Sequence, residues 1–246
     1  MSNDDLFGHP DGVPDSRAGH GLVAALERSR GLGYLGPGPI RTHVHNARAF
    51  LGGLEHLAGG DDTVVDLGSG GGVPGLVLAV LRPDLPIALL DGSTTRCEFL
   101  GEVIDTMDLS PRVVVRCQRA ESAGRDAEIR GKAQVVVARS FAGPAVTAEC
   151  AAPLLAVGGR ILVSEPPSRS SDPPHGSDVA GESTGPTARS RLGGDRWPTD
   201  GLSGLGLALG RRFEALGSTV QELIVERLTD DRFPRRVGIP SKRPLF

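Results

Sequence analysis

The sequence contains few cysteines, few aromatic residues and no long apolar run. Cys97, Cys117 and Cys150 are an odd, scattered set without a C-x-x-C pair, which argues against a disulfide framework and fits reduced thiols in a cytosol. No apolar run reaches the roughly 18–20 residues of a membrane span. The acidic opening "MSNDDLFGHP" lacks the apolar core of a signal peptide. We therefore expect a cytoplasmic protein with no membrane association and no bound metal.

Lysine is nearly absent as well. Only Lys132 and Lys242 are lysines among 27 basic residues, which leaves 27 − 2 = 25 arginines beside 35 glycines. This bias fits the base composition of a genome better than an RNA-binding signature, and the formal net charge of −3 points to no particular partner. With 39% hydrophobic and 23% charged residues, the chain has the composition of a globular protein.

Short apolar runs alternate with helical patterns through the middle of the chain. The runs are rich in Val, Ile and Leu without polar alternation, as in parallel strands that are buried on both faces. The sequence therefore predicts an α/β fold with a Rossmann-like, mostly parallel, doubly wound sheet, helices on both faces and N-terminal helices, and a ligand at the carboxyl ends of the strands. The expected strands are 63–67, 86–91, 112–117, 134–139 and 160–165, and the expected helices between them are 74–81, 95–107 and 144–155.

Two segments have the composition of disordered chain. Residues 1–20 carry little apolar content, and from Pro166 to Gly204, 20 of 39 residues are Pro, Gly or Ser. We expect a disordered tail over 1–20, a disordered insertion over 166–204, and one domain built from 21–165 and 205–246. Apolar spacing within this domain predicts an amphipathic helix over 43–57.

An acid and several glycines follow the first expected strand in "VVDLGSGGGVPG". Asp66 ends the strand, and Gly68, Gly70 and Gly72 follow at every second position. This D-x-G-x-G-x-G spacing resembles motif I of class I S-adenosylmethionine (SAM)-dependent methyltransferases. Glycines let the backbone pass beside the methionine part of the cofactor, and the acid is expected to face its cationic end.

The same glycines allow two other interpretations. Gly70, Gly72 and Gly75 satisfy the dinucleotide fingerprint G-x-G-x-x-G, and a glycine turn can be purely structural. Asp66 favours SAM, because an anion at this place would repel a pyrophosphate. A short-chain reductase would also require a downstream Tyr-x-x-x-Lys, whereas the only tyrosine, Tyr34, precedes the loop.

A second acid closes the next expected strand in "IALLD". Asp91 stands where a carboxylate can accept hydrogen bonds from the hydroxyls of a ribose, a device that NAD and SAM enzymes share. The alternative is a helix N-cap for the residues from Thr94 onward.

Four stretches together resemble one family. They are "VVDLGSGGGVPGLVLAVLRPDLPIALLDGSTTRCEFL", "VVVRCQRAES", "VVVARSFA" and "RFPRRVGIPSKRPLF". They are similar to the ribosomal RNA small subunit methyltransferase G family, also called glucose-inhibited division protein B, which methylates N7 of a guanine in 16S rRNA. The similarity covers roughly Asp62 to Val163 and the C-terminal tail. It implies SAM as the cofactor and 16S rRNA or the small ribosomal subunit as the partner, and it leaves the oligomeric state open.

The resemblance also implies cofactor contacts. They fall on Gly68 and Val73 in the glycine loop, on Ala120 and Glu121 after the third strand, and on Arg139 after the fourth. Arg139 could pair with the carboxylate of the cofactor or steer a phosphate, since a guanidinium suits both anions; it could also be a surface arginine. Glu121 could instead cap a helix.

Several positions depart from the family pattern. Asn46 replaces an acid in an H-x-x-D pattern, threonines in "DGSTTR" replace a lysine, and Glu165 in "ILVSEPP" stands where a lysine is usual. Arg96 and Arg119 match basic family positions. These changes preserve the cofactor half and alter the half that is expected to meet RNA.

The chemistry of guanine N7 makes few demands on side chains. N7 carries a lone pair and no proton, so its methylation requires no general base, and His43 and His45 are expected to be surface or packing residues. The basic tail Arg232–Phe246 and Arg139 are the candidate phosphate contacts. Two alternatives stay open: a diverged methyltransferase for another RNA or a small molecule, and a SAM-binding module without catalysis.

Overall fold

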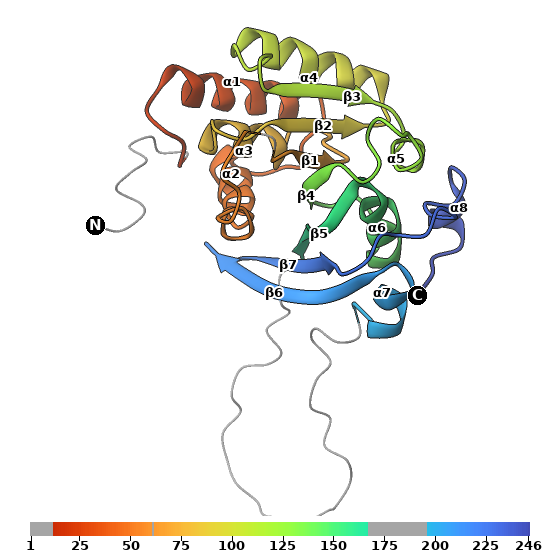
Figure 1. The fold of residues 1–246 in the computed structure, drawn as a ribbon. Helices are drawn as coiled ribbons and strands as arrows, with labels where there is room; N and C mark the ends of the chain where they lie inside the picture. Colours follow the sequence, from red (N-terminus) through yellow and green to blue (C-terminus); the bar gives the residue numbers. More distant parts are fainter. Residues whose placement is uncertain (1–11, 61, 167–195) are drawn as a thin grey trace, which may run out of the picture.

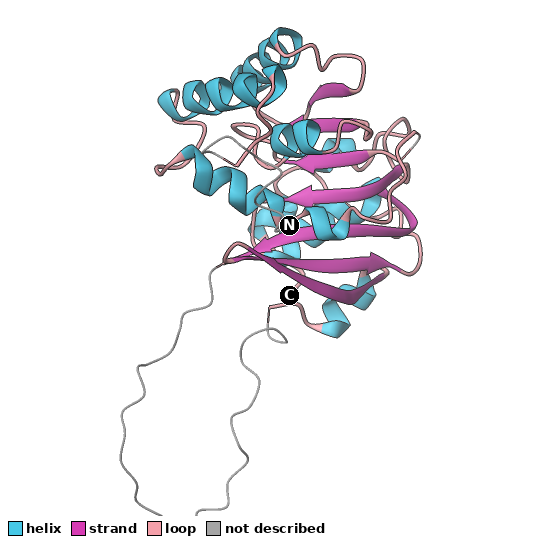
Figure 2. Cartoon of the chain, turned by 90° about the vertical axis from the view of Figure 1, so that its left-hand side faces the viewer, coloured by secondary structure: helices cyan, strands magenta, loops and turns pink. Residues whose placement is uncertain are grey.

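The computed structural model describes residues 12–60, 62–166 and 196–246. A seven-stranded sheet with the order β3-β2-β1-β4-β5-β7-β6 forms its centre. Strands β1 to β5 run parallel, β7 pairs antiparallel with β5, and β6 pairs antiparallel with β7. Figure 2 shows the strands as a twisted stack. Their bounds are β1 (Val64–Leu67), β2 (Ile87–Asp91), β3 (Val113–Cys117), β4 (Ala133–Ala138), β5 (Leu155–Glu165), β6 (Leu207–Ala215) and β7 (Ser218–Val225).

Helices cover both faces of this sheet (Figure 1). One layer holds α1 (Arg17–Gly31), α2 (Ile40–Arg48), the 3-10 turn η2 (Leu51–Gly53), α3 (Gly75–Leu81) and α4 (Thr94–Thr106). The other holds α5 (Ala120–Ala123), α6 (Pro144–Ala151), the 3-10 turn η3 (Ala152–Leu154) and α7 (Thr199–Gly204), and α8 (Ile239–Lys242) packs near α6.

Alternate residues of the strands enter opposite cores. Val64 packs in the core beneath α1 to α4, and its neighbour Val65 packs in the core beneath α5 to α7. All four residues of β1 are buried, as expected for a strand that is covered on both faces. The predicted doubly wound, mostly parallel sheet is therefore confirmed.

Two predicted boundaries are wrong. The tail ends earlier than residue 20, because α1 begins at Arg17, where the Ser16 side chain accepts a hydrogen bond from the Gly19 N–H. The predicted insertion 166–204 includes folded chain at its end, because α7 lies within it and Trp197, only 2% exposed, packs in the second core. Residues 1–11 and 167–195 of these predictions lie outside the described residues.

The predicted helix over 43–57 is also different in the structure. α2 begins earlier, at Ile40, and ends at Arg48, after which the chain tightens into η2. Within η2 the chain passes directly over β5, since a Cβ on Gly53 would lie 2.5 Å from a methyl carbon of Leu162.

Candidate functional site

The loop after β1 has a backbone that favours glycine. Gly68, Gly70 and Gly72 have φ angles of +74°, +54° and +95°, a left-handed region that other residues rarely adopt. A Cβ on Gly68 would lie 2.5 Å from the Phe141 ring. A Cβ on Gly70 would meet nothing closer than 3.7 Å, so this glycine borders open space. The loop therefore packs closely at Gly68 and leaves its main chain uncovered at Gly70.

That open space is a cavity of about 590 Å³ at the carboxyl ends of β1, β2 and β4. Its volume lies within the roughly 300–1,000 Å³ of small-molecule sites. Most of the sequence-predicted cofactor contacts line it together, from four separate stretches of chain: Gly68, Gly70, Val73, Asp91, Ala120, Glu121 and Arg139.

Asp66 and Gly72 do not belong to the cavity wall. Gly72 lies beneath the loop, where a Cβ would lie 3.5 Å from a methyl carbon of Leu100. Asp66 is completely buried, and its Oδ2 accepts a hydrogen bond of 3.0 Å from the N–H of Gly75 at the start of α3. Gly75, the third glycine of the dinucleotide pattern, therefore packs against a carboxylate. Burial raises the pKa of Asp66 to about 7.

The carboxylate of Asp91 lies between the glycine loop and α4. Its Oδ2 accepts a hydrogen bond of 2.9 Å from Gly70 N–H, and its Oδ1 accepts from Ser93 N–H at 2.9 Å and from Arg96 Nε at 3.0 Å. Asp91 is thus not the N-cap of α4, whose N-cap residue is Ser93. Each carboxylate oxygen has about two acceptor positions, so Oδ2 keeps one for a ribose hydroxyl.

Glu121 fixes the C-terminal segment beside the cavity. Its side chain is buried, and Oε1 accepts a hydrogen bond of 2.9 Å from Gly238 N–H, 117 residues away along the chain. Oε2 lies 3.6 Å from Arg119 Nε. The carboxylate does not cap α5, as the alternative would require. Ala120, next to Glu121, and Ser241, three residues after Gly238, both line the cavity.

Arg139 extends inward from the end of β4. Its Nη2 lies 3.3 Å from His43 Nδ1, and His43 Nε2 lies 3.1 Å from the carbonyl oxygen of Gly36. A carbonyl accepts and a guanidinium donates, so His43 is neutral with its proton on Nε2. Burial, followed by the charge of Arg139, lowers the pKa of His43. His43 is a packing residue, as expected.

The second terminal nitrogen of Arg139 is free. Nη1 is buried and has no hydrogen-bond partner among the described residues, while the residue itself lines the cavity. Arg139 as a residue lines the cavity, and a guanidinium suits the carboxylate of SAM, while Asp91 suits the ribose and the uncovered main chain at Gly70 lies between these two residues. The residues present therefore fit the cofactor.

A second cavity, of about 530 Å³, adjoins the first. Residues 139–142 line both cavities and so form a shared wall between them. The last residues of β5, the first residues of β7 and Asn46 of α2 form the opposite side of the second cavity. Its polar lining residues include Asn46, Thr147, Ser164, Glu165, Arg196 and Ser218. Sequence reasoning noted Asn46 and Glu165 only as departures from a pattern, and nothing local in the sequence indicates that they meet.

The first cavity also contains residues that sequence reasoning missed. Tyr34, Leu35 and Gly36 close it from the turn between α1 and α2, and Phe141 contributes from the shared wall. The turn-rich stretch "GLGYLGPGP" was the available signal for the first group, because exposed turns near strand ends commonly carry binding residues.

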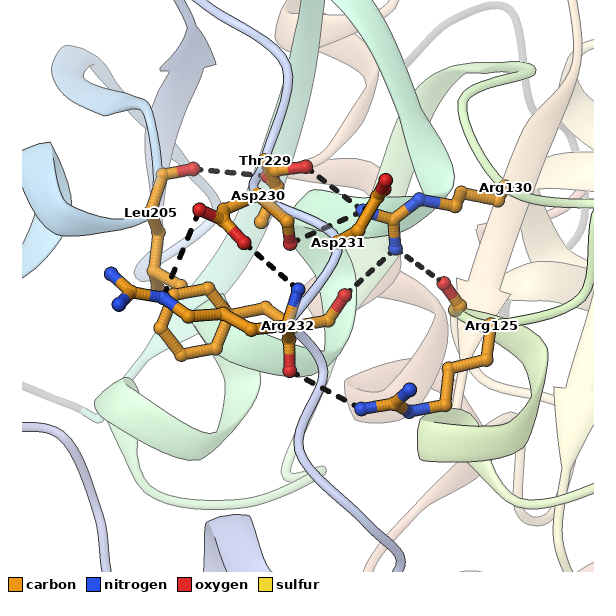
Figure 3. A network of polar contacts seen from close by, with 9 residues as sticks. Arg125, Arg130, Leu205, Thr229, Asp230, Asp231 and Arg232 are labelled. Atoms are coloured by element: carbon orange, nitrogen blue, oxygen red, sulfur yellow. Dashed lines mark hydrogen bonds and ion pairs between the residues drawn. The ribbon is translucent and has the colours of Figure 1, made fainter.

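The basic C-terminal segment is anchored to the domain (Figure 3). Arg130 donates hydrogen bonds of 2.8 Å and 2.7 Å to the carbonyl oxygens of Thr229 and Phe233. Arg235 donates to both carboxylate oxygens of the buried Glu149, at 2.8 Å and 2.6 Å. The segment 232–246 is therefore a wall of the domain, with exposed cations on its outer side.

Two further findings concern the described residues only. They include no helix long and apolar enough to cross a membrane. Within 12–60, 62–166 and 196–246, no group of three His, Cys, Asp or Glu side chains is placed to hold a metal ion.

Comparisons with known proteins identify the fold and the family. A solved structure of P. horikoshii TYW2 in complex with MeSAdo superimposes with a TM-score of 0.50 at 15% identity, over 78% of this chain and 65% of that one, which supports the fold. The chain is 36% identical to a ribosomal RNA small subunit methyltransferase G from Roseiflexus sp. over 81% of its length and 79% of the relative. The protein of that name from Deinococcus radiodurans is 35% identical over 80% and 73%. Residues 41–167 match the family model for rRNA small subunit methyltransferase G. The chain therefore belongs to the rRNA small subunit methyltransferase G family of SAM-dependent methyltransferases.

Proposed function

We propose that the protein transfers the methyl group of SAM to N7 of a guanine in the RNA of the small ribosomal subunit. The observation that carries this proposal is the shared wall. Residues 139–142 line both a cavity that fits SAM and a second cavity large enough for a base, so the two cavities are neighbours. A methyl donor and its acceptor must come into direct contact, and neighbouring cavities place them side by side.

The side chains around the wall suit an acceptor that loses no proton. His43 has its Nε2 proton bound to Gly36 and its Nδ1 bound to Arg139, so neither nitrogen is available as a base. Cys150 lines the first cavity, but burial raises the pKa of its thiol to about 12, which keeps it a thiol at neutral pH. Guanine N7 has a lone pair and requires neither group.

SAM, when bound, supplies a methyl group on a positively charged sulfur. Attack by the N7 lone pair would take up this methyl group, leaving the electron pair of the sulfur–carbon bond on sulfur and the positive charge on the purine. The chain would orient the partners: Asp91 and Gly70 would hold the cofactor, Arg139 would pair with its carboxylate, and Phe141 lines both cavities. No proton moves in this step.

RNA would approach across exposed cations near the two cavities. Arg236, Lys242 and Arg243 are exposed on the C-terminal segment, and Ser241 beside them lines the first cavity. Phosphate contacts of this kind hold RNA without reading its sequence. A base must leave its stack to enter the second cavity, as in other enzymes that modify bases. A ribosomal substrate would place the protein in the cytoplasm.

The test is nucleotide-resolved mapping of N7 methylation. Small subunits from cells that lack the gene are incubated with the purified protein and SAM, and methylated guanines in their RNA are mapped. The proposal predicts one guanine that gains an N7 methyl group and lacks it without the protein. Cofactor binding with no methylated guanine would support the non-catalytic alternative, and methylation of another RNA or a small molecule would support the diverged one.

A further inference from the structure

Glu165 is the acidic residue of the second cavity, and it lies at the end of β5. Its side chain is 9% exposed and lines the cavity together with Arg196. Oε1 accepts a hydrogen bond of 2.8 Å from Trp197 Nε1, and Oε2 is paired with Arg196 Nε at 2.8 Å. Arg196 and Trp197, in the segment that leads into α7, therefore hold the carboxylate in place.

This arrangement leaves one acceptor position on each oxygen. A carboxylate has about four lone-pair positions, and only one contact reaches each oxygen of Glu165 among the described residues. Two adjacent acceptors match two adjacent N–H donors. Among the RNA bases, guanine presents such a pair on its Watson–Crick edge, N1–H and the N2 amino group, whereas adenine presents the acceptor N1 there.

The position of Glu165 also suits the reaction. N7 lies on the edge of guanine opposite the N1 and N2 donors. Strands β5 and β4 are neighbours in the sheet, about 4.8 Å apart. A purine held at the end of β5 by its Watson–Crick edge can therefore present N7 toward the end of β4, where residues 139–142 line both cavities.

We propose that Glu165 is the residue by which the second cavity selects guanine, through hydrogen bonds from N1–H and the N2 amino group. This inference rests on the proposed function and names the base-reading residue of the same site. Trp197 also holds Oε1, so the position of the carboxylate does not depend on the ion pair with Arg196.

The experiment measures binding of three mononucleotides to the protein loaded with S-adenosylhomocysteine. GMP carries both donors, IMP carries N1–H alone, and AMP carries neither at these positions. Calorimetric titration of the wild-type protein should give affinities in the order GMP, IMP, AMP, with GMP at least about tenfold tighter than AMP. Equal affinities, or no binding of GMP, would overturn the inference.

Two variants separate base reading from a structural role. Glu165→Gln keeps the side-chain volume and an acceptor for Trp197, so we expect it to fold and to bind S-adenosylhomocysteine like the wild type. It should lose most of the preference for GMP over AMP. Arg196→Ala removes the ion pair but not the acceptors, and it should keep that preference. A preference that survives in Glu165→Gln, or disappears equally in Arg196→Ala, would contradict the assignment.

The same proteins distinguish this inference from the proposed function. If the wild type prefers GMP but methylates no guanine in small subunits, the base site stands and the proposed reaction fails. If it methylates subunits and Glu165→Gln does so with unchanged kcat and KM, the reaction stands and the role of Glu165 fails.

Discussion

The Nη2 group of Arg139 lies 3.3 Å from Nδ1 of His43, so helix α2 holds the arginine at the end of β4. The contact requires a neutral imidazole, because a protonated Nδ1 would face a cation. Burial and Arg139 lower the pKa of His43 below its ordinary value of 6.5. The cofactor cavity is thus connected to a titratable residue outside its wall.

We expect this contact to weaken in acid. Because its folded-state pKa is lowered, His43 binds fewer protons in the folded than in the unfolded protein, and the free energy of unfolding falls as the pH drops below about 6.5. His43→Gln keeps an acceptor for Arg139 and does not titrate. Its free energy of unfolding should therefore fall less than that of the wild type as the pH drops. Denaturant unfolding of both proteins between pH 5 and pH 8 measures it, and parallel curves would contradict the expectation.

Asp66 is expected to have the opposite effect on the pH dependence of stability. Burial raises its pKa from 3.8 to about 7, so the folded protein binds more protons than the unfolded one between these values. The free energy of unfolding should therefore fall as the pH rises from about 4 to about 7. Asp66→Asn keeps an acceptor for Gly75 N–H. As the pH rises over this range, its free energy of unfolding should increase relative to that of the wild type, by up to about 4 kcal/mol.

The control for this measurement is Asp105→Asn, at an exposed carboxylate of α4. It should follow the wild-type pH curve. If Asp66→Asn follows that curve as well, the carboxyl of Asp66 is ionised throughout and the burial argument is wrong.

Asp91 should contribute directly to SAM affinity. Asp91→Ala removes the expected ribose acceptor and also leaves Gly70 N–H without its partner, so we expect binding at least about tenfold weaker, about 1.4 kcal/mol. Calorimetric titration with SAM measures the loss. Glu98→Ala, on the exposed side of α4, is the matched control and should bind like the wild type. Equal affinity in a folded Asp91→Ala protein would remove Asp91 from the site.

The exposed cations of the C-terminal segment should govern the salt dependence of RNA binding. Deleting 232–246 would also remove the partners of Glu121 and Glu149, so replacing only the exposed side chains is the cleaner test. Combined replacement of Arg236, Lys242 and Arg243 by alanine should weaken binding to small subunits and flatten the slope of log affinity against log salt. SAM affinity should be unchanged. An unaltered salt slope would place the RNA contacts elsewhere.

The parallel strands and the glycine loop were predictable because their signals are local. The run "VVDL" is apolar enough to be buried on both faces, and the φ angles of Gly68 and Gly70 agree with the reason given for glycine there. The strand order places Asp91 beside Gly70, because Asp91 ends β2, Gly70 follows β1, and these two strands are neighbours.

The second cavity was not predictable, because its members meet only in the folded chain. Asn46 lies 2.5 Å from Ser218 Oγ across 172 residues of sequence, and Glu165 meets Trp197 beyond a segment rich in Pro, Gly and Ser. Helix α7 was also not predictable, because it is only six residues long and two of them are glycines, which disfavour helices. Asp66 and Gly72 matched the motif, but packing places both under the loop.

The most direct test of this account is a crystal structure of the protein with SAM or S-adenosylhomocysteine bound. We expect adenosyl density in the cavity of about 590 Å³, with the ribose hydroxyls within hydrogen-bond distance of Asp91 and the carboxylate of the ligand beside the guanidinium of Arg139. A cofactor bound outside this cavity, or one whose ribose and carboxylate reach neither residue, would contradict it.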